Sequence, residues 1–330
     1  MIRTTPITSA QNPKIKEAVS LGYRSDVRRE RGLFLVEGRR EVARCIAAGF
    51  RVRCIFWCPE LLSEEEFEAT AAVDAPVSPA VDFEEKAAAD APVSPVVDFE
   101  EKAAADAPVS PAVVLGRACE TGASAAAEPV KSYKARNLTK IFEVPAGVYE
   151  KIAYRGGTEG IVAEVEWRDR TLADLQGNPS LLMVLEAVEK PGNLGAVLRS
   201  ADAAGADALI ICDSATDIYN PNVIRASVGA VFTVPTVCCS SGEAIKWLKD
   251  NGIQILTAQL QDSSLYYDTP MTGPTAIVMG TESTGLTSVW REAADAHIRI
   301  PMLGAEDSLN VSVSAAILLF EAVRQRFKSP

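Results

Sequence analysis

The sequence has little of what a metal site or a disulfide-stabilised fold requires. Only one of its 330 residues is a histidine, and the seven cysteines are scattered without a CxxC pair. Protein zinc sites combine several cysteine and histidine ligands at short spacings. We therefore expect reduced thiols and no bound metal.

Long apolar runs are also absent. No stretch approaches the ~18 consecutive apolar residues of a membrane-spanning helix, and the N-terminal segment MIRTTPITSAQNPKIK is too polar for a signal peptide. With 48% hydrophobic and 23% charged residues, the composition is typical of a globular protein. These features predict a cytoplasmic protein, and the length predicts two domains.

The net charge of −11 at pH 7 is unevenly distributed along the chain. Residues 1–57 contain 12 Lys and Arg against 5 Asp and Glu, whereas residues 58–130 contain 3 against 16. One segment therefore supplies most of the excess negative charge, and the N-terminal part is basic. Because a clustered basic face attracts phosphate whatever the global charge, the acidic balance does not exclude a nucleic-acid partner.

A repeat of 16 residues makes up much of the acidic segment. DAPVSPAVDFEEKAAA at 74–89 recurs with one change at 90–105, and a third copy begins at 106. Pro, Ala, Glu and Asp predominate, so the segment buries too little apolar surface to offset the entropy cost of ordering. We interpret residues 69–130 as a low-complexity acidic surface insertion, with a functional tether as the alternative.

Short apolar strands alternate with helices along the rest of the chain. The expected strands lie at 32–38, 52–58, within 140–153, and at 160–167, 181–188, 208–213, 234–239, 254–260, 275–280 and 297–302. The expected helices lie at 39–49, within 140–153, and at 193–205, 220–229, 241–251 and 311–327. This alternation predicts an α/β fold with a mostly parallel sheet covered on both faces.

Three segments of the second half place small and polar residues where a strand ends. They are KPGNLGAVLR (190–199), VMGTESTGL (278–286) and IPMLGAEDSLNVSVSAA (300–316). Since ligands of parallel sheets bind beyond the carboxyl ends of the strands, we expect the three segments to form one pocket. Glycines at 192, 195, 280 and 285 would let the backbone approach a ligand closely. The first segment has neither G-x-G-x-x-G nor G-x-x-x-x-G-K-[ST], which argues against a dinucleotide or a nucleoside triphosphate.

Together these segments resemble the three signature motifs of the SpoU (TrmH) branch of the SPOUT RNA methyltransferases. The shared pattern is N-x-G-x-x-x-R, then G-x-E-x-x-G-L, then S-L-N-V-S-V, in this order near the C-terminus. The N-terminal part, with FLVEG and GIVAEVE, is similar to the ribosomal-protein L30e-like domain that often precedes them. The resemblance implies an L30e-like substrate-binding domain at 1–168, interrupted by the insertion, a linker at 169–179 and a methyltransferase domain at 180–330.

The resemblance also implies a trefoil-knotted α/β domain that binds S-adenosylmethionine and forms a homodimer. The implied reaction is methyl transfer to a ribose 2′-hydroxyl of rRNA or tRNA, and an L30e-like domain favours structured rRNA. Arg199 corresponds to the proposed catalytic residue of the family, and the other polar motif positions are Asn193, Glu282, Ser308 and Asn310. The expected cofactor-contacting residues are Gly280, Thr281, Gly285, Ile300, Met302 and Leu309, with Thr281 standing where the family often has Asn.

Each of these residues also has a structural interpretation. Arg199 lies in an otherwise apolar segment and could be a buried ion-pair partner, and Glu282 could be a surface or capping carboxylate. Ser308 and Asn310 could cap the last helix, since Ser and Asn are preferred there. His297 alternates with isoleucines in a strand, and we interpret it as structural.

Arginine is a poor general base because its pKa is above about 12. Arg199 would therefore clamp an RNA phosphate and orient the ribose hydroxyl, or else act together with that phosphate in deprotonation. The first of these roles is favoured, because orientation alone lowers a bimolecular barrier substantially.

The basic segment RSDVRRERG (24–32) predicts RNA contact by Arg28, Arg29 and Arg31, with Arg39 and Arg225 as further candidates. Phosphate contacts supply much of the affinity for nucleic acid. The alternatives are a solvated helix face at 24–32 and a structural Arg225.

Three functions remain: an RNA 2′-O-ribose methyltransferase, a non-catalytic RNA-binding or assembly factor with the same fold, and a dehydrogenase with a degenerate turn. The intact set of polar motif residues favours the first.

Overall fold

The computed structural model describes residues 3–71, 140–154, 159–175, 177, 179–188, 190–214, 216–281, 284–305 and 307–327. All of these residues belong to one compact unit. The predicted insertion at 69–130 lies outside the described residues except for its first three, which complete helix α4 (Glu64–Ala71). Thr70 is buried in this helix. Helix α4 therefore extends three residues into the expected insertion, whose bounds otherwise stay a prediction.

The N-terminal part of the chain forms a five-stranded sheet. Its strands are β1 (Thr5–Pro6), β2 (Leu33–Glu37), β3 (Val52–Trp57), β4 (Lys140–Glu143) and β5 (Ile161–Glu166), in the order β1-β4-β3-β5-β2. Strands β1, β4 and β3 are parallel, and β5 runs antiparallel to both β3 and β2. Its helices are α1 (Pro13–Tyr23), α2 (Ser25–Arg31), α3 (Arg39–Ala47), α4 and α5 (Ala146–Ile152).

The C-terminal part forms a seven-stranded sheet in which every pair of neighbours is parallel. Its strands, in the spatial order β10-β12-β9-β11-β6-β7-β8, are β6 (Leu181–Glu186), β7 (Ala208–Cys212), β8 (Thr236–Cys239), β9 (Gln254–Ala258), β10 (Ser264–Leu265), β11 (Thr275–Met279) and β12 (Ala296–Arg299). Its helices are α6 (Pro191–Ala203), α7 (Pro221–Ala226), α8 (Ala230–Thr233), α9 (Ser241–Asp250), α10 (Ser288–Ala293) and α11 (Val311–Phe327), with 3₁₀ turns at Leu172–Asp174 and Tyr266–Asp268.

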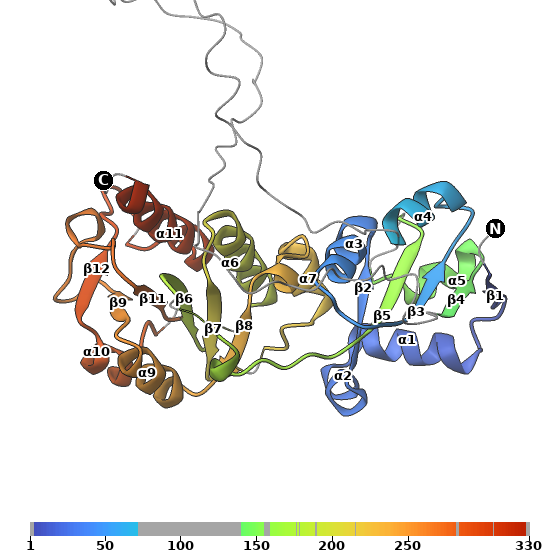
Figure 1. Ribbon diagram of the computed structural model, residues 1–330, viewed down its shortest axis with the longest axis horizontal. Helices are drawn as coiled ribbons and strands as arrows, with labels where there is room; N and C mark the ends of the chain where they lie inside the picture. Colours follow the sequence, from blue (N-terminus) through green and yellow to red (C-terminus); the bar gives the residue numbers. More distant parts are fainter. Residues whose placement is uncertain are drawn as a thin grey trace, which may run out of the picture. The chain divides into compact units, whose positions relative to one another are not determined.

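Both faces of the C-terminal sheet are covered by helices (Figure 1). Successive side chains of β6 point to opposite faces, so Met183 packs in the core that α6 and α11 share, whereas Val184 packs in the core that contains Trp290 of α10. This double burial explains why the strands are continuous apolar runs. All strands end at one edge of the sheet, and the loops beyond that edge are therefore brought together.

The structure confirms the α/β class and the mostly parallel sheet. The closing helix spans 311–327 as expected, and each strand expected in the described residues is present within three residues of its predicted ends. The sequence interpretation missed α1, α4, α8 and α10 as separate helices, because these segments lack a long apolar period. Within the part that the structure describes, no helix is long and apolar enough to cross a membrane.

Candidate cofactor pocket and active site

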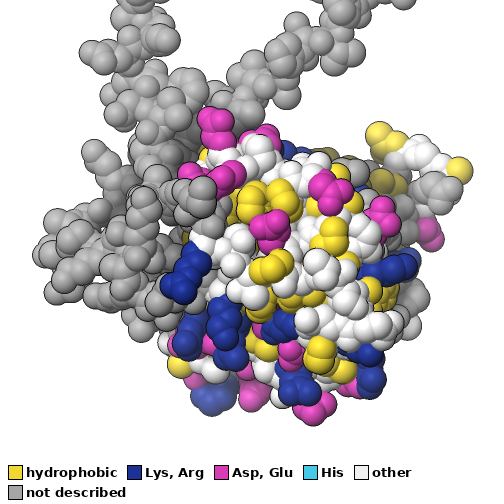
Figure 2. Space-filling view, turned by 90° about the vertical axis from the view of Figure 1, so that its right-hand side faces the viewer, with side chains coloured by type: hydrophobic (Ala, Val, Ile, Leu, Met, Phe, Trp, Pro, Cys, Tyr) yellow, Lys and Arg dark blue, Asp and Glu magenta, His cyan; other side chains and the backbone are white. Residues whose placement is uncertain are grey.

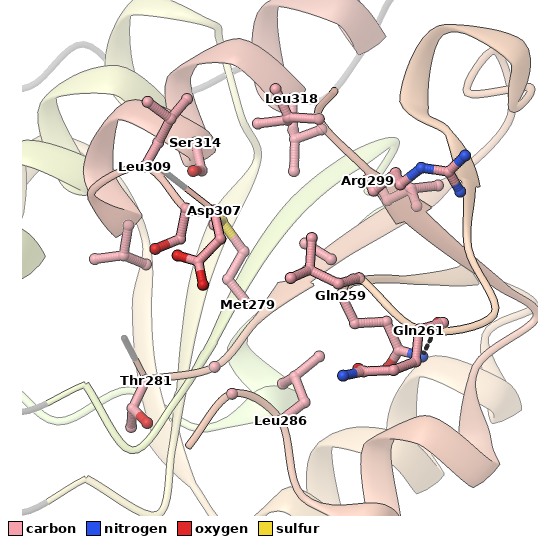
Figure 3. A pocket seen from close by; sticks show the side chains of 18 of the residues that line it. Gln259, Gln261, Met279, Thr281, Leu286, Arg299, Asp307, Leu309, Ser314 and Leu318 are labelled. Atoms are coloured by element: carbon pink, nitrogen blue, oxygen red, sulfur yellow. Dashed lines mark hydrogen bonds between the residues drawn. The ribbon is translucent and has the colours of Figure 1, made fainter. Parts of the chain in front are cut away.

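A pocket of about 370 Å³ lies beyond the carboxyl ends of β9, β11 and β12 (Figure 3). This volume is in the range of small-molecule sites. The loops after these strands and the first turns of α11 form its walls. All six residues that the sequence predicts as cofactor contacts line it: Gly280, Thr281, Gly285, Ile300, Met302 and Leu309. The second and third motifs therefore meet, as expected from the parallel sheet.

The second motif forms a tight loop in which the backbone nearly touches itself. A Cβ atom added to Gly280 would lie only 2.3 Å from the carbonyl carbon of Gly285. Thr281 and Gly285 form an isolated β-bridge, and Gly285 N donates to Thr281 O at 3.0 Å. The hydroxyls of Thr281 and Thr284 are hydrogen bonded at 2.8 Å. Gly280 is therefore required by this close approach. Glu282 lies outside the described residues, and its predicted role stays a prediction.

The third motif leads from the pocket into α11. Ser308 is exposed and lines the pocket. Asn310 acts at the helix start, where its Oδ1 accepts hydrogen bonds from Ser312 N at 3.0 Å and Ser312 Oγ at 2.6 Å. Its Nδ2 donates to Asn193 Oδ1 at 3.2 Å. Asn310 therefore both caps the helix and joins the third motif to the first.

The first motif forms the start of α6 rather than a wall of the pocket. Arg199 is exposed, which excludes its interpretation as a buried ion-pair partner. Its guanidinium makes no hydrogen bond or ion pair with another described residue, and it does not line the pocket. Gly195 does not approach a ligand as expected: a Cβ atom there would lie 2.5 Å from Ala226 Cβ, so this glycine lets α6 pack on α7.

Comparison with known proteins agrees with this geometry. Residues 180–320 match the SpoU rRNA Methylase family, and residues 12–91 match the MRM3-like substrate binding domain. A 23S rRNA (guanosine-2′-O-)-methyltransferase RlmB from Pseudomonas syringae pv. tomato is 37% identical over 179 residues, which cover 52% of this chain and 72% of that protein. The chain belongs to the SpoU rRNA methylase family.

Solved structures of SpoU relatives share the fold over nearly the whole chain. The crystal structure of an RNA 2′-O ribose methyltransferase is 33% identical, with a TM-score of 0.69 over 98% of this chain and 100% of that one. An AdoMet-bound rRNA methyltransferase from Sinorhizobium meliloti is 25% identical, with a TM-score of 0.72 over 97% of this chain and 98% of that one. The trefoil knot that the resemblance implies stays a prediction.

One of the arginines predicted to contact RNA has a different role. Arg28 is 1% exposed, and its Nε donates to Asp217 Oδ2 at 2.6 Å. Its Nη1 donates to Leu21 O at 2.6 Å. Nearby, Phe34 of β2 stacks on Tyr219 with 4.1 Å between ring centroids. The prediction for Arg28 is therefore wrong, because this guanidinium links α2 to the segment before α7 in the SpoU domain.

The other four predicted arginines are accessible to differing extents. Arg29, Arg31 and Arg225 are exposed, whereas Arg39 is half-buried and its Nη1 donates to Glu66 Oε1 at 2.9 Å. Figure 2 shows the face on the right-hand side of Figure 1, where many Lys and Arg side chains gather in the lower half. Asp and Glu side chains lie among them. The Lys and Arg side chains on this face suit contact with a phosphate backbone, and RNA contact by the four arginines stays a prediction.

No sequence motif indicated Gln259, which also lines the pocket of this SpoU chain. Its Nε2 donates to Gln261 O at 2.9 Å, which fixes the orientation of the side-chain amide. Its Oε1 is buried and has no hydrogen-bond partner among the described residues. A buried acceptor of this kind is costly unless a ligand satisfies it. In Figure 3, Gln259 and Asp307 lie on opposite sides of Met279.

These side chains fit S-adenosylmethionine. The apolar side chains of Met279, Leu286 and Leu309 suit an adenine ring, and Gln259 Oε1 could accept a hydrogen bond from a donor of the adenosine part. The Asp307 carboxylate on the other side suits the positively charged end of the molecule. Within the described ranges, no three His, Cys, Asp or Glu side chains are grouped as a metal site would need.

His297 has a partner that supports its structural interpretation. Its Nδ1 lies 2.6 Å from Oγ1 of Thr257, its neighbour in the pairing of β12 with β9. Thr257 is fully buried. The imidazole therefore satisfies a buried hydroxyl inside the sheet, and it is absent from the residues that line the pocket.

Proposed function

We propose that this chain methylates a ribose 2′-hydroxyl of ribosomal RNA, with S-adenosylmethionine as the methyl donor. One observation carries the proposal: the residues of the second and third motifs line a single pocket, and Asn310 ties the first motif to it through Asn193. The chain is an RNA 2′-O-ribose methyltransferase of the SpoU family. The choice of rRNA follows the relative from Pseudomonas syringae pv. tomato, which is named a 23S rRNA methyltransferase.

The pocket residues would hold the cofactor through both backbone and side chains. Gly280 and Gly285 line the pocket with backbone, and the missing Cβ of Gly280 lets the second loop close on itself. Ile300, Met302 and Leu309 line it from the third loop, and Thr281 offers a hydroxyl. Bound S-adenosylmethionine supplies a methyl group on a positively charged sulfur, which is a good leaving group.

Arg199 and the polar motif residues would act on the RNA. The exposed guanidinium of Arg199 can bind a phosphate with two parallel hydrogen bonds. Holding the hydroxyl in line with the methyl group can remove about 7–11 kcal/mol from a bimolecular barrier. Asn193, Glu282, Ser308 and Asn310 are the further residues that we assign to the active site, and Asn193 and Asn310 support this by their hydrogen bond.

A second copy of the chain would complete this site. Arg199 does not line the pocket of its own chain. Val313 and Phe320 of the neighbouring helix α11 are 47% and 48% exposed, and Leu309, just before this helix, is 38% exposed. These apolar side chains form an exposed stripe, which suits an isologous interface between two identical helices. We expect Phe320→Glu to give a monomer in sedimentation velocity, and a wild-type monomer would contradict the dimer.

The N-terminal part would bind the RNA. The expected location of the protein is the cytoplasm, because the proposed substrate is ribosomal RNA. The domain assignment remains as expected from the sequence: substrate binding at 1–168, a linker at 169–179 and methyl transfer at 180–330. In support, the SpoU match begins at residue 180.

The test is transfer of tritiated methyl groups from S-adenosylmethionine to total rRNA and, separately, to total tRNA. We expect incorporation into rRNA, with the label recovered as a 2′-O-methylnucleoside after digestion. A preference for tRNA would overturn the choice of substrate. Binding of S-adenosylhomocysteine without any methyl transfer would favour the alternative, a non-catalytic RNA-binding factor with the same fold.

A further inference from the structure

A buried carboxylate at the end of β6 holds the segment that follows the second motif. Glu186 is 3% exposed, and both of its carboxylate oxygens accept hydrogen bonds from Thr287. Thr287 N donates to Oε2 at 2.8 Å, and Thr287 Oγ1 donates to Oε1 at 2.6 Å. Hydrogen bonds to a charged group are roughly twice as strong as neutral ones, so this contact is a firm tether.

The Thr287 hydroxyl is not used for its own helix. Thr287 is the N-cap residue of α10, but its side chain makes no capping hydrogen bond. Threonine at this position normally stabilises a helix through such a bond. The helix is held elsewhere, since buried Trp290 donates from Nε1 to Ser241 Oγ at 2.8 Å. The hydroxyl therefore fixes the segment before the helix.

That segment is a wall of the cofactor pocket. Thr284, Gly285 and Leu286 all line the pocket and directly precede Thr287. The loop is held at its start by β11 and at its end by the tether to Glu186. A shift of Thr287 would therefore move the backbone that faces the cofactor.

The backbone after Glu186 is also unusual. Ala187 has φ of 53°, a left-handed conformation that is strained for an alanine. Its N–H donates to Cys212 O at 2.8 Å, which holds the chain in this turn. Strained residues of this kind persist where surrounding structure requires them, often at functional sites. The turn directs the chain away from the sheet immediately after the tethering carboxylate.

We propose that Glu186 is a positioning residue for the cofactor: through Thr287 it fixes the 284–286 wall and thereby sets the affinity for S-adenosylmethionine. The inference rests on the proposed function, because it assigns that pocket to the cofactor. Glu186 takes no part in methyl transfer itself. Loss of the hydrogen bonds between Glu186 and Thr287 weakens binding of S-adenosylmethionine, while the transfer rate at saturating cofactor is unchanged.

The first test is calorimetry of the full-length chain with S-adenosylhomocysteine. Thr287→Val removes the hydroxyl from an exposed position and is expected to raise Kd about tenfold, equivalent to about 1.4 kcal/mol. The separate variant Thr287→Ser keeps the hydroxyl, and its Kd is expected to lie within about twofold of wild type. The matched control is Thr233→Val, which removes a Thr hydroxyl bonded to Asp202 at 2.7 Å outside the pocket and leaves Kd unchanged.

The second test separates binding from transfer and checks the partner. In methyl-transfer assays, Thr287→Val raises KM for S-adenosylmethionine and leaves kcat unchanged. Glu186→Gln has the same size but lacks the second acceptor, so it raises Kd, and combining it with Thr287→Val adds little further.

Several outcomes would overturn the inference while leaving the proposed function intact: a Thr287→Val variant with wild-type Kd, an equal loss in Thr287→Ser or Thr233→Val, or fully additive losses in the double variant. Failure of the wild-type chain to bind S-adenosylhomocysteine would instead overturn both.

Discussion

Substitution of Gly280 by alanine tests how tightly the second motif closes on itself. The added Cβ would lie 2.3 Å from the carbonyl carbon and oxygen of Gly285 and 2.6 Å from Leu286 N. Carbon atoms in ordinary contact are about 3.5–4.0 Å apart, so the backbone at 285–286 would have to move by about 1 Å. Because both residues line the pocket, this movement would alter its wall.

The expected loss follows from the nature of the obstructing atoms. Overpacking a protein interior costs about 1–3 kcal/mol, and the upper part of this range applies where the obstacle is backbone that cannot rotate aside. If the distortion is confined to the pocket, about 2.7 kcal/mol corresponds to a roughly hundredfold rise in Kd. The assay is calorimetry with S-adenosylhomocysteine, with thermal unfolding measured alongside to show that the Gly280→Ala variant is folded.

Two other glycines provide graded controls. Gly192 is in the first turn of α6 with no atom within 4 Å of an added Cβ, so Gly192→Ala should bind like wild type. Gly285 also has open space, but its φ of 67° strains an alanine by roughly 1–2 kcal/mol, so its loss should be intermediate. A Kd for Gly280→Ala within about threefold of wild type, or an equal loss in Gly192→Ala, would refute the reasoning.

Three further predictions concern other parts of the chain. Arg199→Ala should lower kcat by about 10²–10³-fold, as loss of one transition-state contact does, while Kd for S-adenosylhomocysteine is unchanged; loss of that binding would indicate a structural arginine. Gly195→Ala should lower the free energy of unfolding in urea by about 1–3 kcal/mol, because its Cβ would lie 2.8 Å from Val223 O, and a neutral effect would contradict the close packing of α6 on α7. Burial, partly offset by a hydrogen bond from Tyr154 N, raises the pKa of Glu37, so the folded chain binds this proton more tightly than the unfolded chain. Stability from Glu37 is therefore lost as pH rises through the raised pKa, and Glu37→Gln should raise Tm relative to wild type more at pH 7.5 than at pH 4.5; a pH-independent difference would contradict this.

The sequence predicts the fold class and the pocket for a definite physical reason. Apolar strands alternating with helices specify a parallel sheet, and in a parallel sheet every strand ends at the same edge. Loops that are far apart in the sequence, at 280–286 and 300–309, are therefore brought to one place. The strand direction alone brings these loops together, whatever the order of the strands in the sheet.

The role of a charged residue depends on partners that the sequence does not place. Arg28 lies in a basic segment that is typical of a phosphate-binding surface, yet Asp217 approaches it from 189 positions away and the pair is buried. Its neighbour Arg29 is exposed. Local composition cannot distinguish the two, because the difference arises only when the N-terminal sheet packs against the segment before α7.

The glycines of the motifs show the same limit. Gly195 lies in helix α6 and Gly280 in the loop after β11, and both are required by close approaches. The surface that approaches Gly195 is another helix, whereas the one that approaches Gly280 is the far side of its own loop. A glycine in a motif therefore indicates that something comes close, and only the structure identifies it.

Glu186 was missed for a reason that lies in the strand order. The alternating pattern predicts strands in sequence but not that β11 enters the sheet between β6 and β9. Because β11 pairs with β6, the end of β6 lies next to the loop after β11. This brings Glu186 to Thr287, 101 residues further along the chain. In the sequence, Glu186 is one acidic residue at the end of an apolar strand, and Thr287 is an ordinary N-cap. Their bond follows from the crossover that also builds the pocket, so the residues that hold such a loop are those that motif spacing alone is least able to reveal.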